Sequence, residues 1–105
     1  MAQIFACPVQ VAVDTIGGKW KIVIIYHLLE NVIRFGELKR MIPGITQKML
    51  TQQLRELEAD GIVARRVYAE VPPKVEYSIT ELGKKLEPVF TLLCGWGREY
   101  LKGKG

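Results

Sequence analysis

Apolar residues recur at helical spacing through roughly the first half of the chain and alternate with polar residues after that. The first apolar segment, residues 8–16, begins with Pro8, which suits the first turn of a helix because the N–H that proline lacks has no partner there. Gly17 and Gly18 should end this helix. The next segment, 19–29, is apolar on nearly every side, so we expect a second helix that is buried on several faces.

Two amphipathic helices should follow, separated by a short turn. Residues 34–42 carry apolar side chains at helical spacing and stop at a Pro-Gly pair, which predicts a short third helix. Thr46 can cap a fourth helix over 46–60, and Gly61 should close it in the left-handed conformation. The apolar stripe of the fourth helix is formed by three leucines at i, i+4 and i+7: Leu50, Leu54 and Leu57.

The apolar period then changes from helical to alternating, which is typical of strands. Segments 62–70 and 74–79 predict a hairpin with a stiff tip, because the tip contains two prolines. Thr80 can cap a last helix over 80–102, which Pro88 should kink.

This order of elements predicts a mainly α fold with a small β-hairpin wing. It is the order of a winged helix-turn-helix, as one domain over 1–105. In that fold, 46–60 would be the recognition helix that enters the DNA major groove, and 62–79 would be the wing.

The polar face of the 46–60 segment carries residue types that suit the reading of base edges. Glutamine can bond adenine, arginine can bond guanine and threonine can touch the thymine methyl group, whereas glutamate would be repelled by phosphate. The acidic residues lie in the last turns, away from the end that would enter the groove. A merely solvated face is the alternative, and this face alone does not decide between them. The candidate DNA-contacting residues are Thr46, Gln47, Lys48, Thr51, Gln52 and Arg55.

Basic residues on the predicted wing would meet phosphates, and they favour the nucleic-acid interpretation. Arg65, Arg66 and Lys74 are the candidates. Arg65 and Arg66 face opposite sides of their strand, so at most one of them should point at DNA. The formal net charge of +4 also favours a polyanionic partner.

Four short runs of the chain are distinctive: "IGGKW", "KMLTQQLRELEADG", "VPPKVEYSIT" and the trailing "GWG". Through them the chain resembles, over essentially its whole length, the HxlR-type winged helix-turn-helix regulators of bacteria. It implies a dimeric, sequence-specific DNA-binding repressor or activator, close in fold to MarR-like regulators. The resemblance also implies that the 46–60 helix is the recognition helix and that the first helix contributes to the dimer.

The last predicted helix carries a long apolar seam, whose residues are spaced alternately by four and three positions. The seam consists of Leu82, Leu86, Val89, Leu93, Trp96 and Tyr100. We expect its N-terminal half to pack on the first two helices of its own chain. The C-terminal half should meet a second copy, because large apolar stripes rarely stay uncovered. The candidate dimer residues are Leu93, Trp96 and Tyr100. A two-fold dimer would prefer a palindromic site with half-sites roughly 10 bp apart, or a multiple of that.

Cys7 precedes Pro8 at the expected start of the first helix, where unpaired N–H groups and the helix dipole favour a thiolate. By the family resemblance, a cysteine at this position senses oxidants or electrophiles in several members. A small residue without a signalling role is the equal alternative. Cys94, in the last helix, should be an inert packing residue. A sensing Cys7 could pair with Cys7 or with Cys94 of the other subunit, and these options stay open.

Other function classes find less support. The only histidine, His27, lies in the most apolar segment, and no cluster has the spacing of a catalytic or metal site, so we expect neither an enzyme nor a cofactor. We expect a cytoplasmic protein without a membrane role, because no signal-like start or long apolar span occurs. Two alternatives remain: a winged helix used for protein contacts, and a regulator with a small-molecule cavity near Trp20, Tyr26, Phe90 and Trp96.

Overall fold

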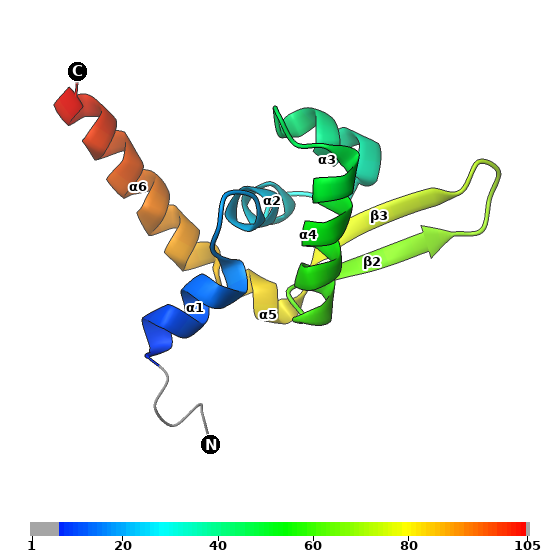
Figure 1. Ribbon diagram of the computed structural model, residues 1–105, viewed down its shortest axis with the longest axis horizontal. Coiled ribbons are helices and arrows are strands. Elements are labelled where there is room, and N and C mark those ends of the chain that lie inside the picture. Colours follow the sequence, from blue (N-terminus) through cyan, green and yellow to red (C-terminus); the bar gives the residue numbers. More distant parts are fainter. Residues whose placement is uncertain (1–6, 105) are drawn as a thin grey trace.

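The computed structural model describes residues 7–104 (Figure 1). Six helices and three strands occur in these residues. They are α1 (Pro8–Ile16), α2 (Lys21–Leu28), β1 (Ile33–Arg34), α3 (Phe35–Met41), α4 (Gln47–Ala59), β2 (Val63–Tyr68), β3 (Lys74–Ile79), α5 (Glu81–Lys84) and α6 (Glu87–Lys104). Most elements match the expected segments, and the winged helix-turn-helix prediction is confirmed.

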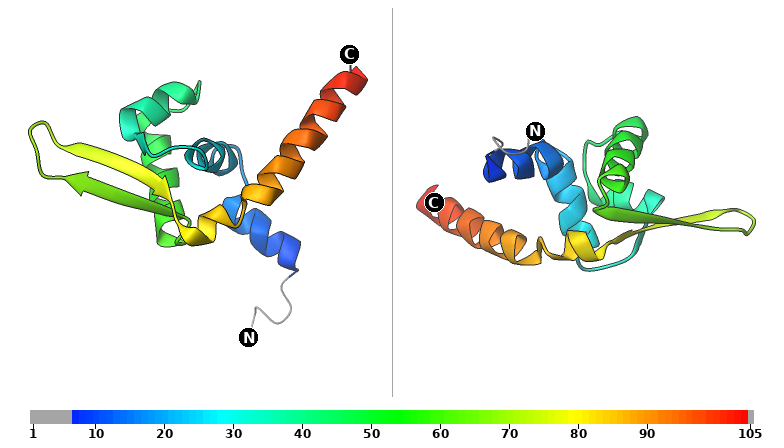
Figure 2. Two further views of the ribbon diagram at one scale, coloured as in Figure 1. Left: turned by 180° about the vertical axis from the view of Figure 1, so that it is seen from behind. Right: turned by 90° about the horizontal axis from the view of Figure 1, so that it is seen from below.

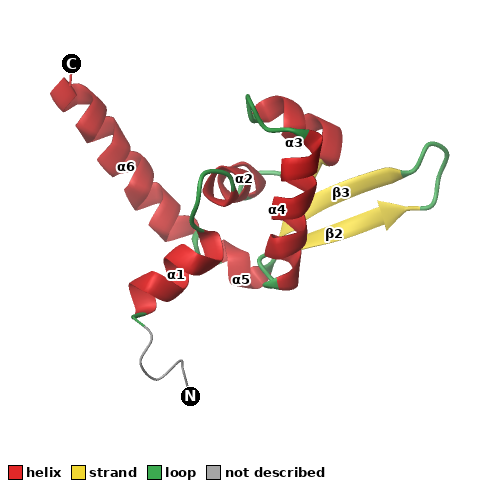
Figure 3. Ribbon diagram, viewed as in Figure 1, coloured by secondary structure: helices red, strands yellow, loops and turns green. Residues whose placement is uncertain are grey.

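The hairpin belongs to a three-stranded antiparallel sheet in the order β1-β3-β2 (Figure 3). The β2–β3 register runs from Val63 opposite Ile79 to Tyr68 opposite Lys74. Strand β1, which pairs Ile33 with Tyr77, was not expected from the sequence. It has only two residues, too few to show an alternation of apolar and polar side chains. It forms because its backbone can pair with the free edge of β3.

The core lies between α2, α3, α4 and the inner face of the sheet. Helix α4 contributes its leucine stripe, which is at most 1% exposed, and α2 contributes side chains on several faces, as its apolar pattern predicted. The largest fully buried side chains are Ile24, Ile25, Leu28, Leu38, Leu50, Leu54, Leu57 and Val63. The interior is therefore filled by the helix-turn-helix half of the chain.

Local hydrogen bonds set the ends of α4 as predicted. The Thr46 hydroxyl accepts the Met49 N–H at 3.1 Å. At the other end Gly61 has φ +77°, and the N–H groups of Gly61 and Ile62 bond the carbonyls of Glu58 and Leu57. This pattern is a Schellman cap, which turns the chain directly into β2.

The expected single kinked helix over 80–102 is wrong, because the chain forms two helices there. Thr80 caps α5 through the Gly83 N–H, as predicted, but α5 ends at Lys84 and α6 begins at Glu87. Pro88 lies in the first turn of α6, where proline costs no hydrogen bond, so it starts a new helix instead of kinking an existing one.

The predicted packing of the seam is only partly right. Leu86 packs against the core, whereas Leu82 and Val89 are about half exposed. The residue of α6 that is buried is Phe90, at 5% exposed. The break before α6 changes the direction of the helix, so the face that meets the core differs from the one that continuous spacing predicts.

The molecule is more extended than its length requires. Its Cα radius of gyration is 15.4 Å, against about 13 Å for an average chain of this size. Helices α1 and α6 project at one end and the β2–β3 hairpin at the other (Figure 2). Within the described residues, no helix is long and apolar enough to cross a membrane.

Candidate nucleic-acid interface

The polar face of α4 is open, because the leucine stripe holds the opposite face in the core. Lys48, Gln52 and Arg55 are exposed, as is Gln47, and Thr51 is half-buried at the shoulder. Thr46 is exposed as well, with its hydroxyl engaged as the cap of the helix. The structure thus brings the α4 candidates together on one surface, and all the side chains that they present there are polar or charged.

A hydrogen-bond network reaches this surface from α2. The Lys21 ammonium lies 2.6 Å from Oε1 of Glu56, and Gln52 Nε2 donates to Oε2 of the same carboxylate at 3.3 Å. The hydrogen bond from Lys21, followed by the one from Gln52, holds the pKa of Glu56 below its usual value. Glu56, one of the acidic residues in the last turns of the helix, thus bonds a candidate DNA-contacting residue directly.

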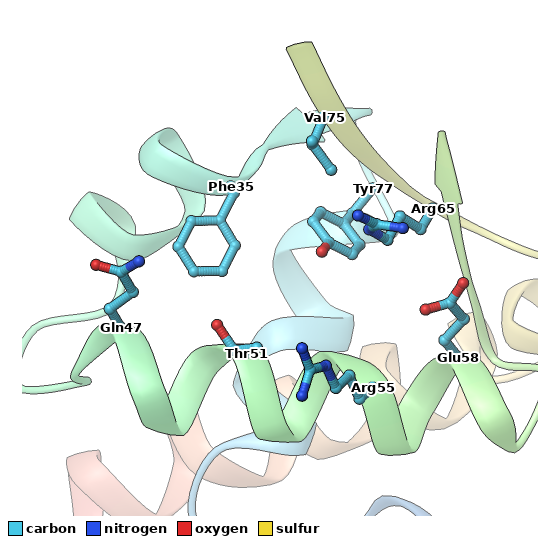
Figure 4. Close-up of a pocket in the computed structure, with 8 residues that line it drawn as sticks. All are labelled: Phe35, Gln47, Thr51, Arg55, Glu58, Arg65, Val75 and Tyr77. Atoms are coloured by element: carbon cyan, nitrogen blue, oxygen red, sulfur yellow. The ribbon is translucent and has the colours of Figure 1, made fainter. Parts of the chain in front are cut away.

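A hollow of about 430 Å³ separates α4 from the sheet (Figure 4). Its apolar side is formed by α3 and β3, and its polar side by α4 and β2. The guanidinium groups of Arg55 and Arg65 turn toward the same hollow. Arg65 therefore joins the α4 candidates. The lining residues are Phe35, Gln47, Thr51, Arg55, Glu58, Arg65, Val75 and Tyr77.

Arg66 and Lys74 lie on the other face of the hairpin, as the alternation of a strand requires. There they surround Tyr68: the Lys74 ammonium is 4.2 Å and the Arg66 guanidinium 4.8 Å from the ring centroid. The Tyr68 hydroxyl donates to Glu76 at 2.8 Å, and Lys74 lies 3.6 Å from the same carboxylate. We call these four residues the wing cluster. Arg66 and Lys74 are thus separate from the hollow beside α4.

The hydrogen bond within the wing cluster shifts two pKa values in opposite directions. It lowers the pKa of Glu76, with a further contribution from the Lys74 charge, and it raises the pKa of Tyr68. Glu76 is therefore ionised and Tyr68 neutral at physiological pH. Sequence spacing gave no sign of this cluster, because it depends on the register of two strands.

At the opposite end of the molecule, α1 and α6 expose apolar side chains that the core does not cover. The predicted exposure of Leu93, Trp96 and Tyr100 is confirmed, and Trp96 stacks on Tyr100 at 5.2 Å between ring centroids. We call the exposed apolar residues of the two helices the arm surface: Val9, Val11, Val13, Val89, Leu92, Leu93, Trp96, Tyr100 and Leu101.

Both cysteines are free thiols in this structure. Cys7 is exposed at the N-cap position of α1, where its carbonyl accepts the Val11 N–H. Cys94 is partly buried and lines a 270 Å³ apolar groove between α2 and α6. Tyr26 and Phe90 line this groove as expected; Trp20 and Trp96 do not.

No group of three or more metal-ligating side chains occurs among residues 7–104. His27 is partly buried beside the Tyr26 ring, within the apolar helix α2. The interface is therefore one of hydrogen-bonding and charged side chains on a helix and an adjacent strand.

Comparisons with known proteins agree with this geometry. The family model described as HxlR-like helix-turn-helix matches residues 15–104. An uncharacterised HTH-type transcriptional regulator of Bacillus subtilis, YdeP, is 55% identical over 94 residues, which span 90% of this chain and 73% of the relative.

Two solved structures share the fold. One is a putative HTH-type transcriptional regulator, YtcD, at 52% identity and a TM-score of 0.88 over 92% of this chain and 99% of the other. The second is the redox regulator HypR in its oxidised form, at 57% identity and a TM-score of 0.84 over 89% and 96%. The chain belongs to the HxlR-like helix-turn-helix family of transcriptional regulators.

Proposed function

We propose that this chain is a cytoplasmic, non-enzymatic regulator that binds a palindromic DNA operator as a homodimer. The observation that carries the proposal is the exposed polar face of α4, which presents Lys48, Gln52 and Arg55. Arg55 also lines the same hollow as Arg65 of the wing. Major-groove edges take glutamine and arginine side chains, and phosphates take arginine and lysine. A surface for protein contact would be expected to carry aromatic or aliphatic anchors instead.

The side chains would divide into two roles in this complex. Gln47, Thr51, Gln52 and Arg55 would contact bases from α4. Thr46 and Lys48, at the start of the helix, would approach the phosphate backbone. Arg65 would contact a phosphate beside α4, and Lys74, next to the tip of the wing, would contact the backbone farther along. Arg66, on the face opposite Arg65, would not point at the DNA.

The arm surface supports the dimer part of the proposal. An apolar surface of this extent is typical of a protein interface, and Leu93, Trp96 and Tyr100 would form its centre. The two-fold axis would then place two copies of α4 on successive half-sites of a palindrome.

Cys7 gives the proposed regulator a site for redox or electrophile sensing. It is exposed at the start of α1, next to the arm surface, and HypR, a redox regulator by its name, is similar over most of this chain. Oxidation would remove two electrons and two protons from two thiols, pass them to the oxidant and leave a disulfide. Such a bond between subunits would change the angle between the two copies of α4.

The proposal is tested by selection of DNA duplexes from a random pool, followed by sequencing, with and without the thiol oxidant diamide. We expect an enriched palindrome that is lost on oxidation and retained by Cys7→Ser. Enrichment that diamide leaves unchanged would remove the redox part alone. No enrichment in either arm would contradict DNA recognition and favour the protein-contact alternative.

A small-molecule effector is a second candidate signal, supported by the apolar groove between α2 and α6. A ligand there would contact Tyr26, Phe90 and Leu93, and so would lie beside the arm surface. The diamide experiment separates the two signals, since a ligand-responsive protein would keep its palindrome under oxidation.

A further inference from the structure

The Lys21–Glu56 pair joins α2 to α4 directly beneath the exposed polar face. Among residues 7–104 it is the one ion pair that links two different helices. The Lys21 side chain is only 13% exposed, whereas that of Glu56 is 44% exposed. The ammonium group is thus held under the edge of α4, where it has little access to solvent or to DNA.

The Glu56 carboxylate divides its two oxygens between two partners. Oε1 accepts from Lys21, and Oε2 accepts from the Gln52 amide one helical turn earlier. Because Lys21 fixes the carboxylate, the carboxylate in turn fixes the amide. Glu56 is ionised at neutral pH, as an ordinary glutamate is, and the hydrogen bonds from Lys21 and Gln52 lower its pKa further.

We infer that Lys21 and Glu56 are positioning residues that set the orientation of the Gln52 amide for base recognition. This inference rests on the proposed function. The bond to Glu56 uses one N–H of Gln52 and leaves the amide oxygen and the second N–H exposed. Adenine is recognised by one acceptor and one donor that lie side by side, because its N6 amino group donates a hydrogen bond and its N7 accepts one.

Positioning acts on specificity through two physical effects. An amide held before binding loses less rotamer freedom when it meets a base, and it cannot flip to present the reverse donor and acceptor order. Lys21 also neutralises a carboxylate that lies next to the DNA-facing surface and would otherwise repel phosphates. Removal of Lys21 abolishes both effects, whereas removal of the Glu56 carboxylate abolishes the positioning of the amide and leaves no negative charge to neutralise.

The test measures binding to four duplexes that differ only at the base pair where Gln52→Ala loses discrimination. Lys21→Met and, separately, Glu56→Gln should reduce discrimination among these four by about fivefold or more, which is within the range of one bidentate base contact. Lys21→Arg should preserve it. In the Gln52→Ala background, Lys21→Met should have no further effect at this position.

Lys19→Met is the matched control, because it removes the same charge from the same turn while leaving the Glu56 network intact. The Lys19 ammonium lies over the Trp20 ring, 4.8 Å from its centroid. This variant should weaken binding equally on all four duplexes. Thermal melting of each variant verifies that it is folded at the assay temperature.

Four results would overturn the inference. Lys21→Met and Glu56→Gln could retain full discrimination, or lose it equally at every base pair, and the pair would then be purely structural. Gln52→Ala could leave every base preference unchanged. A wild-type protein without any base preference would overturn the proposed function together with the inference, so the two failures are distinguishable.

Discussion

Helices α4 and α6 are both amphipathic, but they leave opposite faces exposed. Helix α4 buries its leucine stripe within the chain and presents lysine, glutamine and arginine outward. Helix α6 buries Phe90 and exposes most of its other large apolar side chains. The chemistry of the uncovered face is what the proposed function uses to assign a partner: DNA for the polar face of α4, and a second copy of the chain for the apolar face of α6.

The apolar face of α4 should matter most for folding. Leu54→Ala removes a side chain that is 1% exposed, and should lower the free energy of unfolding by about 2 to 5 kcal/mol. Urea denaturation followed by circular dichroism measures this. Lys48→Ala, on the opposite face, should stay within about 0.5 kcal/mol of wild type. A similar small cost for Leu54→Ala would show that α4 is not anchored as described.

The apolar face of α6 should matter for association instead. Trp96→Glu places a charge on the arm surface at a side chain that is 67% exposed in the single chain. The Kd of the dimer should rise at least about 30-fold, equivalent to about 2 kcal/mol for a central interface residue. Sedimentation velocity measures it, with Lys85→Glu as a charge control outside the arm surface. A dimer that survives Trp96→Glu would place the interface elsewhere.

The polar face of α4 should affect DNA binding, and neither folding nor dimerisation. Arg55→Ala should weaken binding to the selected duplex by about 1 to 3 kcal/mol and relax the preference at one base position. It should leave the dimer and the melting temperature unchanged, because Arg55 is exposed. Fluorescence anisotropy with selected and random duplexes measures both affinities, with Arg98→Ala on α6 as the control. Equal weakening on both duplexes would indicate a phosphate contact.

The smallest predicted effect is a loss of thermal stability at low pH, and it arises in the wing rather than in α1 or α6. The pKa of Glu76 is depressed in the folded protein from an ordinary value of 4.5, so this group stabilises the fold above that pH and the contribution is lost as pH falls through the folded pKa. Wild type should therefore lose more thermal stability between pH 6 and pH 3 than Glu76→Gln. Tyr68→Phe, which removes the hydrogen bond, should behave like Glu76→Gln. Parallel pH profiles for wild type and both variants would contradict this role.

Local signals explain which parts of this structure could be predicted from sequence. The Thr46 cap and the left-handed Gly61 depend on residues within one turn of each other, so both were correctly predicted. The exposure of Leu93, Trp96 and Tyr100 likewise follows from the apolar excess on the last helix, whereas that of the α1 valines was not predicted. These features are properties of short segments.

Features that depend on distant partners were missed. Strand β1 exists through its pairing with β3, and the Lys21–Glu56 pair joins residues 35 positions apart. The break before α6 was misjudged because the sequence shows a proline without showing which helix it belongs to. The DNA-contacting roles of the candidate residues remain predictions.

The strand order β1-β3-β2 has a consequence for solubility. It leaves β2 at an edge of the sheet, with backbone groups that could pair with the same edge of another molecule. Arg65 and Arg66 are exposed in the middle of that strand, and their charges repel a second copy that approaches edge to edge. Positive charge on both faces of the hairpin disfavours such pairing from either side, and this role of the arginine pair is independent of any operator.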